Sequence, residues 1–189
     1  MIAEPRTRRW SLTLVTPLPV WVGLAIGLAL VALASRPVGL AGVGVTAIAA
    51  LIGLMVPLPG QGSRQAALRT WLLVTVVGLA AFGIARATVV GAHPQHVPVW
   101  GAVVTVAAGI GEEALFRRLL YGWLARWGAI TAILASAVLF ALIHVPGYGV
   151  GAFGVDLAAG ILFGWQRWAA GTWSAPAVTH AAANLMQLL

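Results

Sequence analysis

The chain contains no cysteine and no lysine, and only 8% of its 189 residues are charged. The absence of cysteine excludes a disulfide framework, a thiolate nucleophile and a thiolate metal site. A soluble domain carries about a quarter of its residues as charges. The low charge, together with 61% hydrophobic residues, therefore excludes an ordinary soluble fold and indicates that lipid is the solvent for much of the surface.

The charge of the chain has one dominant sign. Its 11 basic residues are all arginines and oppose four acidic residues, which gives a formal net charge of +7. Such an excess would suggest a nucleic-acid partner if it formed a patch on a water-exposed face. The arginines instead stand mostly at the ends of apolar runs, where basic residues mark the cytoplasmic side of a membrane protein. We therefore expect a lipid bilayer, and no nucleic acid, as a partner.

Breaks rich in proline, glycine and arginine divide the sequence into seven apolar stretches of about membrane-spanning length. The predicted fold is an all-α, polytopic transmembrane bundle of about seven helices, in a single membrane domain over residues 1–189. Within the sixth stretch, Gly160 and Gly164 share a helix face and permit a close helix contact. The expected helices cover residues 12–34, 38–56, 68–90, 98–126, 128–145, 151–167 and 173–189.

The distribution of arginines predicts the orientation. If the N-terminus is cytoplasmic, Arg36 alone falls in an outside loop, whereas the opposite orientation inverts the positive-inside rule. We therefore expect a multi-pass protein of the cytoplasmic membrane with a cytoplasmic N-terminus. The arginines on the inside are then Arg6, Arg8, Arg9, Arg64, Arg69, Arg117, Arg118, Arg126 and Arg167. Tryptophans near the expected helix ends are Trp100, Trp123, Trp127, Trp165, Trp168 and Trp173.

Three of the four acidic residues fall inside the expected helices, where an ionisable side chain costs roughly 2.5 to 3.5 kcal/mol. The neighbours Glu112 and Glu113 point about 100° apart. Glu113 stands four residues before Arg117, in the order that favours a salt bridge, and is expected to be structural. Glu112 has no basic partner at that spacing and is free to face a cavity as a general base. Asp156 is expected either to line that cavity or to pair with an arginine.

Two histidines, His144 and His180, lie within apolar stretches, and His180 shares a helix face with Asn184. The other two histidines lie in a proline-containing loop and are not expected to be catalytic. At about 1.5 Å of rise per residue, Glu112 and these three side chains fall within about two or three helical turns of one level. One buried histidine or asparagine is more often an interhelical hydrogen bond, but the set supplies a base, its partner and two hydrogen-bond donors.

Three motifs occur in order on consecutive apolar helices. They are Glu-Glu-x-x-x-Arg at 112–117, Phe-x-x-x-His at 140–144 and His-x-x-x-Asn at 180–184. Together they resemble the CPBP family, the CAAX protease and bacteriocin-processing intramembrane endopeptidases, also called the Abi family. The resemblance covers about the C-terminal half of the chain and makes residues 98–189 the expected catalytic core.

The resemblance implies a role for each motif residue. Glu112 and His144 are expected to activate a water, and His180 and Asn184 to stabilise the oxyanion as the peptide bond is attacked. By the same analogy, Glu113 and the arginine of the first motif, Arg117, shape the site. The expected activity is hydrolysis of a peptide bond in a membrane-embedded or membrane-adjacent protein or peptide.

The resemblance leaves the cofactor open. The family has also been described as metalloproteases with glutamate and histidine ligands, and Glu112, His144 and His180 are able to supply a carboxylate and two imidazoles to a divalent metal such as zinc. The sequence His-Glu-x-x-His is absent, and the ligands would come from separate helices. A metal-free glutamate mechanism is therefore slightly favoured over a metal-dependent one.

Two departures from the family pattern affect the expectations. Arg118 stands where a small residue is usual, and the chain ends at Leu189, soon after Asn184. The last helix is then short, so a partner helix or an oligomer is a possible requirement for closing the site. The alternative to a protease is a noncatalytic membrane protein, a transporter, immunity or scaffold subunit, that uses the same polar groups for solute passage or helix packing.

Overall fold

The computed structural model describes residues 18–34, 40–58, 67–88 and 99–188, and these ranges are helical with no strand among them. The predicted all-α fold is confirmed. The fourth helix, α4, continues without a break through a π-helix, a short α-helix α5 and a 3-10 turn, so the described residues form seven helical rods, as expected. Their bounds are α1 Leu18–Ala34, α2 Leu40–Met55, α3 Leu68–Thr88, α4 Val99–Glu113, π-helix Ala114–Leu120, α5 Tyr121–Leu124, 3-10 turn Ala125–Trp127, α6 Ala129–Tyr148, α7 Phe153–Ala170 and α8 Ser174–Met186.

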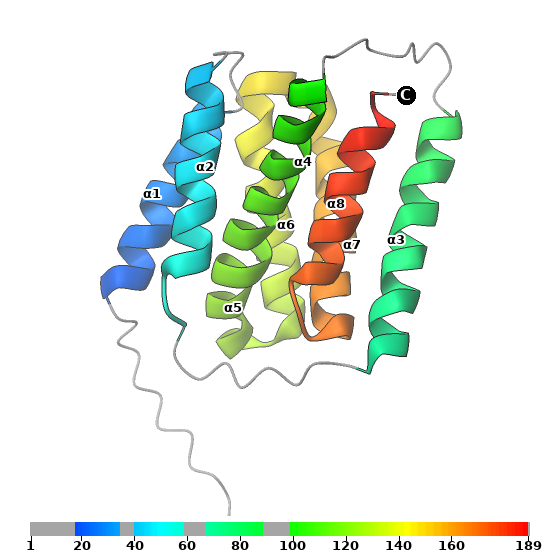
Figure 1. Ribbon diagram of the computed structural model, residues 1–189. Coiled ribbons are helices and arrows are strands. Elements are labelled where there is room, and N and C mark those ends of the chain that lie inside the picture. Colours follow the sequence, from blue (N-terminus) through cyan, green and yellow to red (C-terminus); the bar gives the residue numbers. More distant parts are fainter. Residues whose placement is uncertain (1–17, 35–39, 59–66, 89–98, 189) are drawn as a thin grey trace, which may run out of the picture.

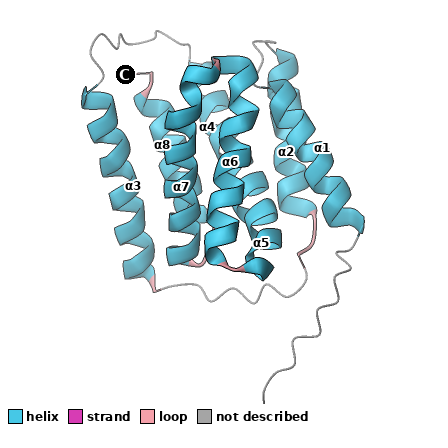
Figure 2. Cartoon of the chain, turned by 180° about the vertical axis from the view of Figure 1, so that it is seen from behind, coloured by secondary structure: helices cyan, strands magenta, loops and turns pink. Residues whose placement is uncertain are grey.

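The rods run side by side as an up-and-down bundle (Figure 1). Helices α4, α6, α7 and α8 form its centre, where α6 packs on α7 and α4 packs on α8. The pair α1 and α2 covers one edge through α4 and the π-helix, and α3 covers the opposite edge through α7 and α8. Figure 2 shows the same order from behind. The central four helices are therefore shielded on two sides by the first three.

Three of the described helices are long and apolar enough to cross a membrane. They are α3, the continuous rod over Val99–Trp127, and α6. The last helix, α8, has 13 residues and is short, as expected, since this length gives about 20 Å of rise.

Several sequence predictions lie outside the described residues. These concern Arg6, Arg8, Arg9, Arg36, Arg64, His93 and His96. Among the described arginines, Arg69 and Arg126 lie at the end of the bundle where α3 and α6 begin, and Arg86 lies in the last turn of α3 at the other end. Arg86 donates from Nε to the carbonyl of Met186, 3.2 Å away, and so satisfies an acceptor at the carboxyl end of α8.

Helix α6 ends later than the proline suggested. We expected an end at residue 145, before Pro146, but the helix includes Pro146 and continues to Tyr148. The chain turns at Gly149, whose φ of 82° lies in the left-handed region that favours glycine. Its N–H donates to the carbonyl of Val145, 2.9 Å away. A proline in the last turn removes only one backbone donor, so the glycine rather than the proline decides where the helix ends.

A π-helix interrupts the α4 rod directly after the glutamate pair. The N–H of Tyr121 donates to the carbonyl of Phe116, five residues earlier. The Arg167 side chain on α7 donates from Nε to the carbonyl of Arg117, 3.1 Å away, and thereby satisfies an acceptor inside the wider turn. The sequence did not predict this element. Segments of this kind occur frequently at functional sites.

Glycines allow two close contacts between helices. A Cβ at Gly160 would meet the backbone of Ala137 on α6, which confirms the predicted close contact of the sixth helix. A Cβ at Gly53 on α2 would meet the backbone of Ala114 and Leu115, at the start of the π-helix. Arg118, the residue that departs from the family pattern, donates to the carbonyls of Gly53 and Val56 and so fixes the carboxyl end of α2 to this segment.

We predict that Gly53→Ala lowers stability, although alanine is the better helix former. The added methyl would push α2 away from the π-helix, and overpacking of this kind costs about 1 to 3 kcal/mol. The matched control is Gly44→Ala on the same helix, where an added Cβ meets nothing within 4 Å. Thermal unfolding in detergent measures both variants. Equal midpoints for the two would show that the contact at Gly53 is not tight.

Candidate active site

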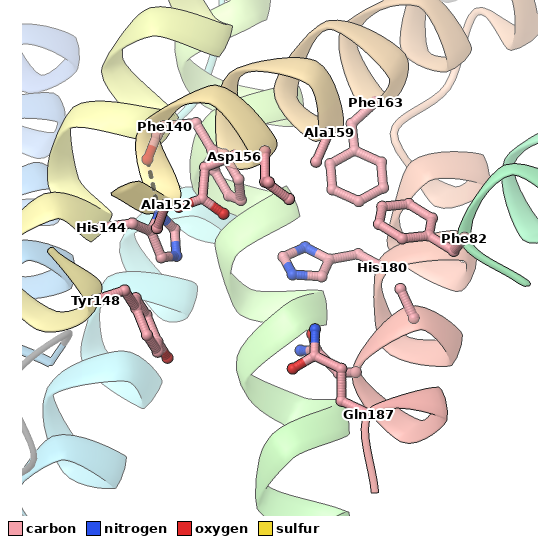
Figure 3. A pocket seen from close by; sticks show the side chains of 13 residues that line it. Phe82, Phe140, His144, Tyr148, Ala152, Asp156, Ala159, Phe163, His180 and Gln187 are labelled. Carbon is pink, nitrogen blue, oxygen red and sulfur yellow. Dashed lines mark hydrogen bonds between the residues drawn. The ribbon is translucent and has the colours of Figure 1, made fainter. Parts of the chain in front are cut away.

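Helices α6, α7 and α8, with Phe82 of α3, line a cavity of about 340 Å³ in the half of the bundle where α6 and α8 end and α7 begins (Figure 3). One wall is apolar, with Phe140 and Phe163 among its side chains. Polar side chains from three helices occupy the rest. These are His144, Tyr148, Asp156, His180, Asn184 and Gln187.

The structure brings Glu112 to the two imidazoles that line this cavity. Glu112 Oε2 lies 3.6 Å from Nε2 of His144 and 4.0 Å from Nε2 of His180. These distances exceed a hydrogen bond, and no described residue forms a hydrogen bond to this buried oxygen. Glu112 is not among the residues that line the cavity, although we expected it there. Its carboxylate lies beside the two imidazole rings, and these rings do line the cavity. A carboxylate and two imidazoles from three helices thus share one small volume.

The predicted salt bridge between Glu113 and Arg117 is present and fully buried. Arg117 Nη1 donates to Glu113 Oε1 over 3.0 Å, and both side chains are 0% exposed. The same carboxylate oxygen lies 2.9 Å from Nδ1 of His180. Glu113 therefore contacts the imidazole of His180 in addition to its predicted partner Arg117. His180 has one glutamate at each ring nitrogen, an arrangement that the sequence did not predict.

Arg117 contacts two further helices, although its buried Nε has no hydrogen-bond partner among the described residues. Its Nη2 donates to the carbonyl of Gly160 on α7, 3.1 Å away. Its guanidinium lies over the rings of Phe140 and Phe163, at 4.6 and 5.1 Å from the ring centres. A cation in an apolar interior is stabilised by such faces in addition to its anion. Arg117 thereby joins the α4 rod to α6 and α7 directly beneath the cavity residues.

His144 has a defined protonation at one ring nitrogen. Its Nδ1 lies 2.7 Å from the carbonyl of Phe140, one turn earlier on α6. A carbonyl is only an acceptor, so Nδ1 carries a proton, and Nε2 is the nitrogen that faces Glu112. The Phe-x-x-x-His spacing places the carbonyl and the ring on one helix face. The motif therefore fixes the tautomer as well as the position of the ring.

Asn184 lies in the cavity wall one turn after His180. Its Nδ2 donates to the carbonyl of Thr105 on α4, 3.1 Å away. A Cβ at Gly109 would lie 3.0 Å from this amide and 3.3 Å from the ring of His180. The glycine thus permits α8 to lie close to α4 at the level of the site. The amide group has a second N–H that this bond does not use.

A polar cluster missed by the sequence analysis fixes α8 from the other side. Gln166 Nε2 donates to the carbonyl of Val74 at 2.7 Å and to the hydroxyl of Thr179 at 2.8 Å. Gly78 on α3 leaves room for both side chains. The cluster joins α3, α7 and α8, and Thr179 directly precedes His180. The feature of the sequence that could have predicted this cluster is Gln166 within an apolar stretch, because glutamines in membrane helices form interhelical hydrogen bonds.

The described residues contain no group of three or more histidine, cysteine, aspartate or glutamate side chains placed to hold a metal ion. Glu112, His144 and His180, the suggested ligand set, converge but do not form such a site in this arrangement. We therefore derive no step through a metal.

A second, apolar groove of about 480 Å³ lies between α3 and α7. It shares Phe82, Val155 and Ala159 with the active-site cavity. The remaining lining is alanine, glycine and leucine. The polar cavity is therefore bordered by an apolar groove on the side of α3.

We predict that Arg117→Met strongly reduces stability, because it leaves the buried Glu113 carboxylate without its cation. Breaking a buried ion pair in this way costs about 3 to 5 kcal/mol. The double variant Glu113→Gln with Arg117→Met is expected to recover part of that loss, since no unpaired charge remains. Accumulation in membranes and thermal unfolding measure the effect, with Arg69→Met at the exposed start of α3 as the control. A single variant as stable as the control would contradict the role given to the ion pair.

A family model described as Rce1-like, type II CAAX prenyl endopeptidase, matches residues 94–186. No curated protein and no solved structure matches the chain. The matched range contains the π-helix and all four central helices, and thus every polar side chain of the cavity wall except Gln187. With its three motifs in order, and with Glu112 beside the two imidazoles that line the cavity, this multi-pass membrane protein belongs to the Rce1-like, type II CAAX prenyl endopeptidases of the CPBP family.

Proposed function

We propose that the protein is an intramembrane endopeptidase of the glutamate type that hydrolyses a peptide bond of a membrane-embedded or membrane-adjacent protein or peptide. The observation that carries this proposal is the position of Glu112 Oε2, within 3.6 and 4.0 Å of two imidazole nitrogens. Burying a carboxylate in an apolar bundle costs free energy, so its presence there indicates a function. Membership in a family of CAAX endopeptidases supports the same reaction class.

Glu112 and His144 are proposed to activate the water. The ionised carboxylate is an acceptor, and Nε2 of His144 is an acceptor when Nδ1 donates to Phe140. A water between these two groups donates one hydrogen to each and directs its lone pair to the scissile carbonyl. Glu112 takes a proton as the bond forms, and the proton passes to the leaving amine.

His180 and Asn184 are proposed to stabilise the oxyanion. Nδ1 of His180 donates to Glu113, and in the imidazolium form of the ring Nε2 carries a second hydrogen for the oxyanion, with a glutamate near each nitrogen. Asn184 donates one N–H to Thr105 and has a second for the substrate oxygen. Donors held in place before the reaction stabilise developing charge without reorganising.

Glu113 and Arg117 are proposed to position these groups. Neither lines the cavity, and their ion pair orients His180 from behind. We propose on the same grounds that residues 98–189 carry the catalytic core and that α1, α2 and α3 support it.

A membrane-embedded segment is the substrate that fits the surroundings of the site best. The apolar groove between α3 and α7 joins the cavity through shared residues, and an apolar segment of substrate lies there without exposing its surface to water. The positions of the arginines favour insertion in the cytoplasmic membrane with the N-terminus inside. The cavity then lies in the outer half of the bundle.

We predict that Glu112→Gln abolishes cleavage while the protein still accumulates. The substitution keeps the shape of the side chain and removes the base, and loss of general-base catalysis lowers rates by about 10² to 10⁴. The measurement compares membranes with the parent and variant proteins by quantitative proteomics of peptide ends. Full proteolysis by Glu112→Gln at normal accumulation would exclude Glu112 as the base.

We also predict that cleavage does not depend on a metal ion. Purified protein dialysed against a chelator is expected to retain its activity, and elemental analysis is expected to find less than one equivalent of zinc. The control is an equal dialysis without chelator, which accounts for loss of activity on handling. Loss of cleavage that added zinc restores would establish the metal-dependent alternative.

A further inference from the structure

Asp156 is the third acidic side chain in the catalytic half of the chain, and the proposed reaction does not use it. It lies in the first turn of α7 and lines the active-site cavity. In Figure 3 its carboxylate points toward the space between His144 and His180. It is thus placed to contact whatever occupies the cavity beside the reacting groups.

The described residues do not neutralise this carboxylate. Its Oδ2 is buried without a hydrogen-bond partner, and no ion pair joins Asp156 to an arginine in the described ranges, although we expected such a pair as one alternative. The start of α7 has no side-chain capping bond, so helix capping does not account for it. The nearest described arginine at the site, Arg117, is bound to Glu113 and to the carbonyl of Gly160.

Other lining groups add hydrogen-bond acceptors beside this carboxylate. Asp156 is the only carboxylate among the residues that line the cavity, beside the imidazoles of His144 and His180. Tyr148 on α6 and Gln187, directly after α8, supply further oxygen atoms, and both are suited to accept hydrogen bonds from an ammonium or guanidinium group. An unpaired carboxylate bordered by neutral oxygen acceptors binds a basic side chain and rejects an acidic one.

We infer that Asp156 is a specificity-determining residue, and that its carboxylate binds a lysine or arginine side chain of the substrate close to the scissile bond. This inference rests on the proposed endopeptidase function. The cavity volume of about 340 Å³ accommodates one such side chain together with the reacting peptide group. The apolar groove beside it takes neighbouring apolar residues. The substrate is therefore an apolar segment interrupted or bordered by a basic residue.

The test maps cleavage sites in a peptide library, made by digesting a cell lysate with a protease that cuts after glutamate so that lysine and arginine stay internal. The purified full chain in detergent is expected to cleave with a basic residue enriched at one fixed position from the scissile bond. Asp156→Asn is expected to lose that enrichment, and Asp156→Glu, which keeps the charge, to retain it. Glu112→Gln gives the background of sites that do not depend on the enzyme.

A pair of peptides measures the effect quantitatively. One is the best-cleaved library peptide with lysine at the enriched position, and the other carries norleucine there. We expect the parent protein to prefer the lysine peptide by at least about tenfold in kcat/KM, and Asp156→Asn to cleave the two at similar rates. If Asp156→Asn does not accumulate, the peptide pair on the parent protein and on Asp156→Glu still decides the question.

The outcomes separate the two proposals. Glu112-dependent cleavage without a basic preference overturns the role of Asp156 and leaves the protease function standing. An equal loss for both peptides in Asp156→Asn also overturns it, because a merely structural role has that effect. The absence of any Glu112-dependent cleavage overturns the protease function, and the inference about Asp156 with it.

Discussion

The buried contact of Glu113 with Arg117 is the interaction on which the rest of the site depends. It places a full cation and a full anion in the interior of an apolar bundle, where neither is stable alone. Arg117 reaches α7 through the carbonyl of Gly160, and Glu113 reaches α8 through His180. The two charges therefore satisfy each other and at the same time tie three central helices together. The imidazole of His180, which Glu113 contacts, also lies 4.0 Å from the carboxylate of Glu112.

The sequence allowed the fold and much of the site to be predicted, because membrane solvation makes its pattern easy to interpret. A continuous apolar run of spanning length satisfies its backbone groups within lipid as a helix, and the seven rods agree closely with the expected ranges. The pairing of Glu113 with Arg117 followed from a spacing of four residues. The convergence of Glu112 with the two histidines was expected from their common depth, and the structure places them together.

The features that could not be predicted depend on contacts between helices. The two glutamates point in different directions around the helix axis, yet both lie near His180. Its ring lies between them, with Nε2 facing Glu112 and Nδ1 facing Glu113. No spacing rule within one helix contains that information. The cluster of Gln166 and Thr179 likewise depends on α3, which is distant in sequence and leaves space at Gly78. Arg118 looked like a departure from the family, but it binds the end of α2.

The π-helix over Ala114–Leu120 separates the rod into two parts with different rotational phase. Upstream of it, the glutamate pair faces the histidines, and downstream, Tyr121 and Leu124 face the core. A uniform α-helix of the same length would rotate one of these faces away, since one residue corresponds to about 100°. The wide turn thus lets one helical rod direct the glutamate pair to the histidines and Tyr121 and Leu124 to the core. The number of residues in the π-helix therefore matters as much as their identity.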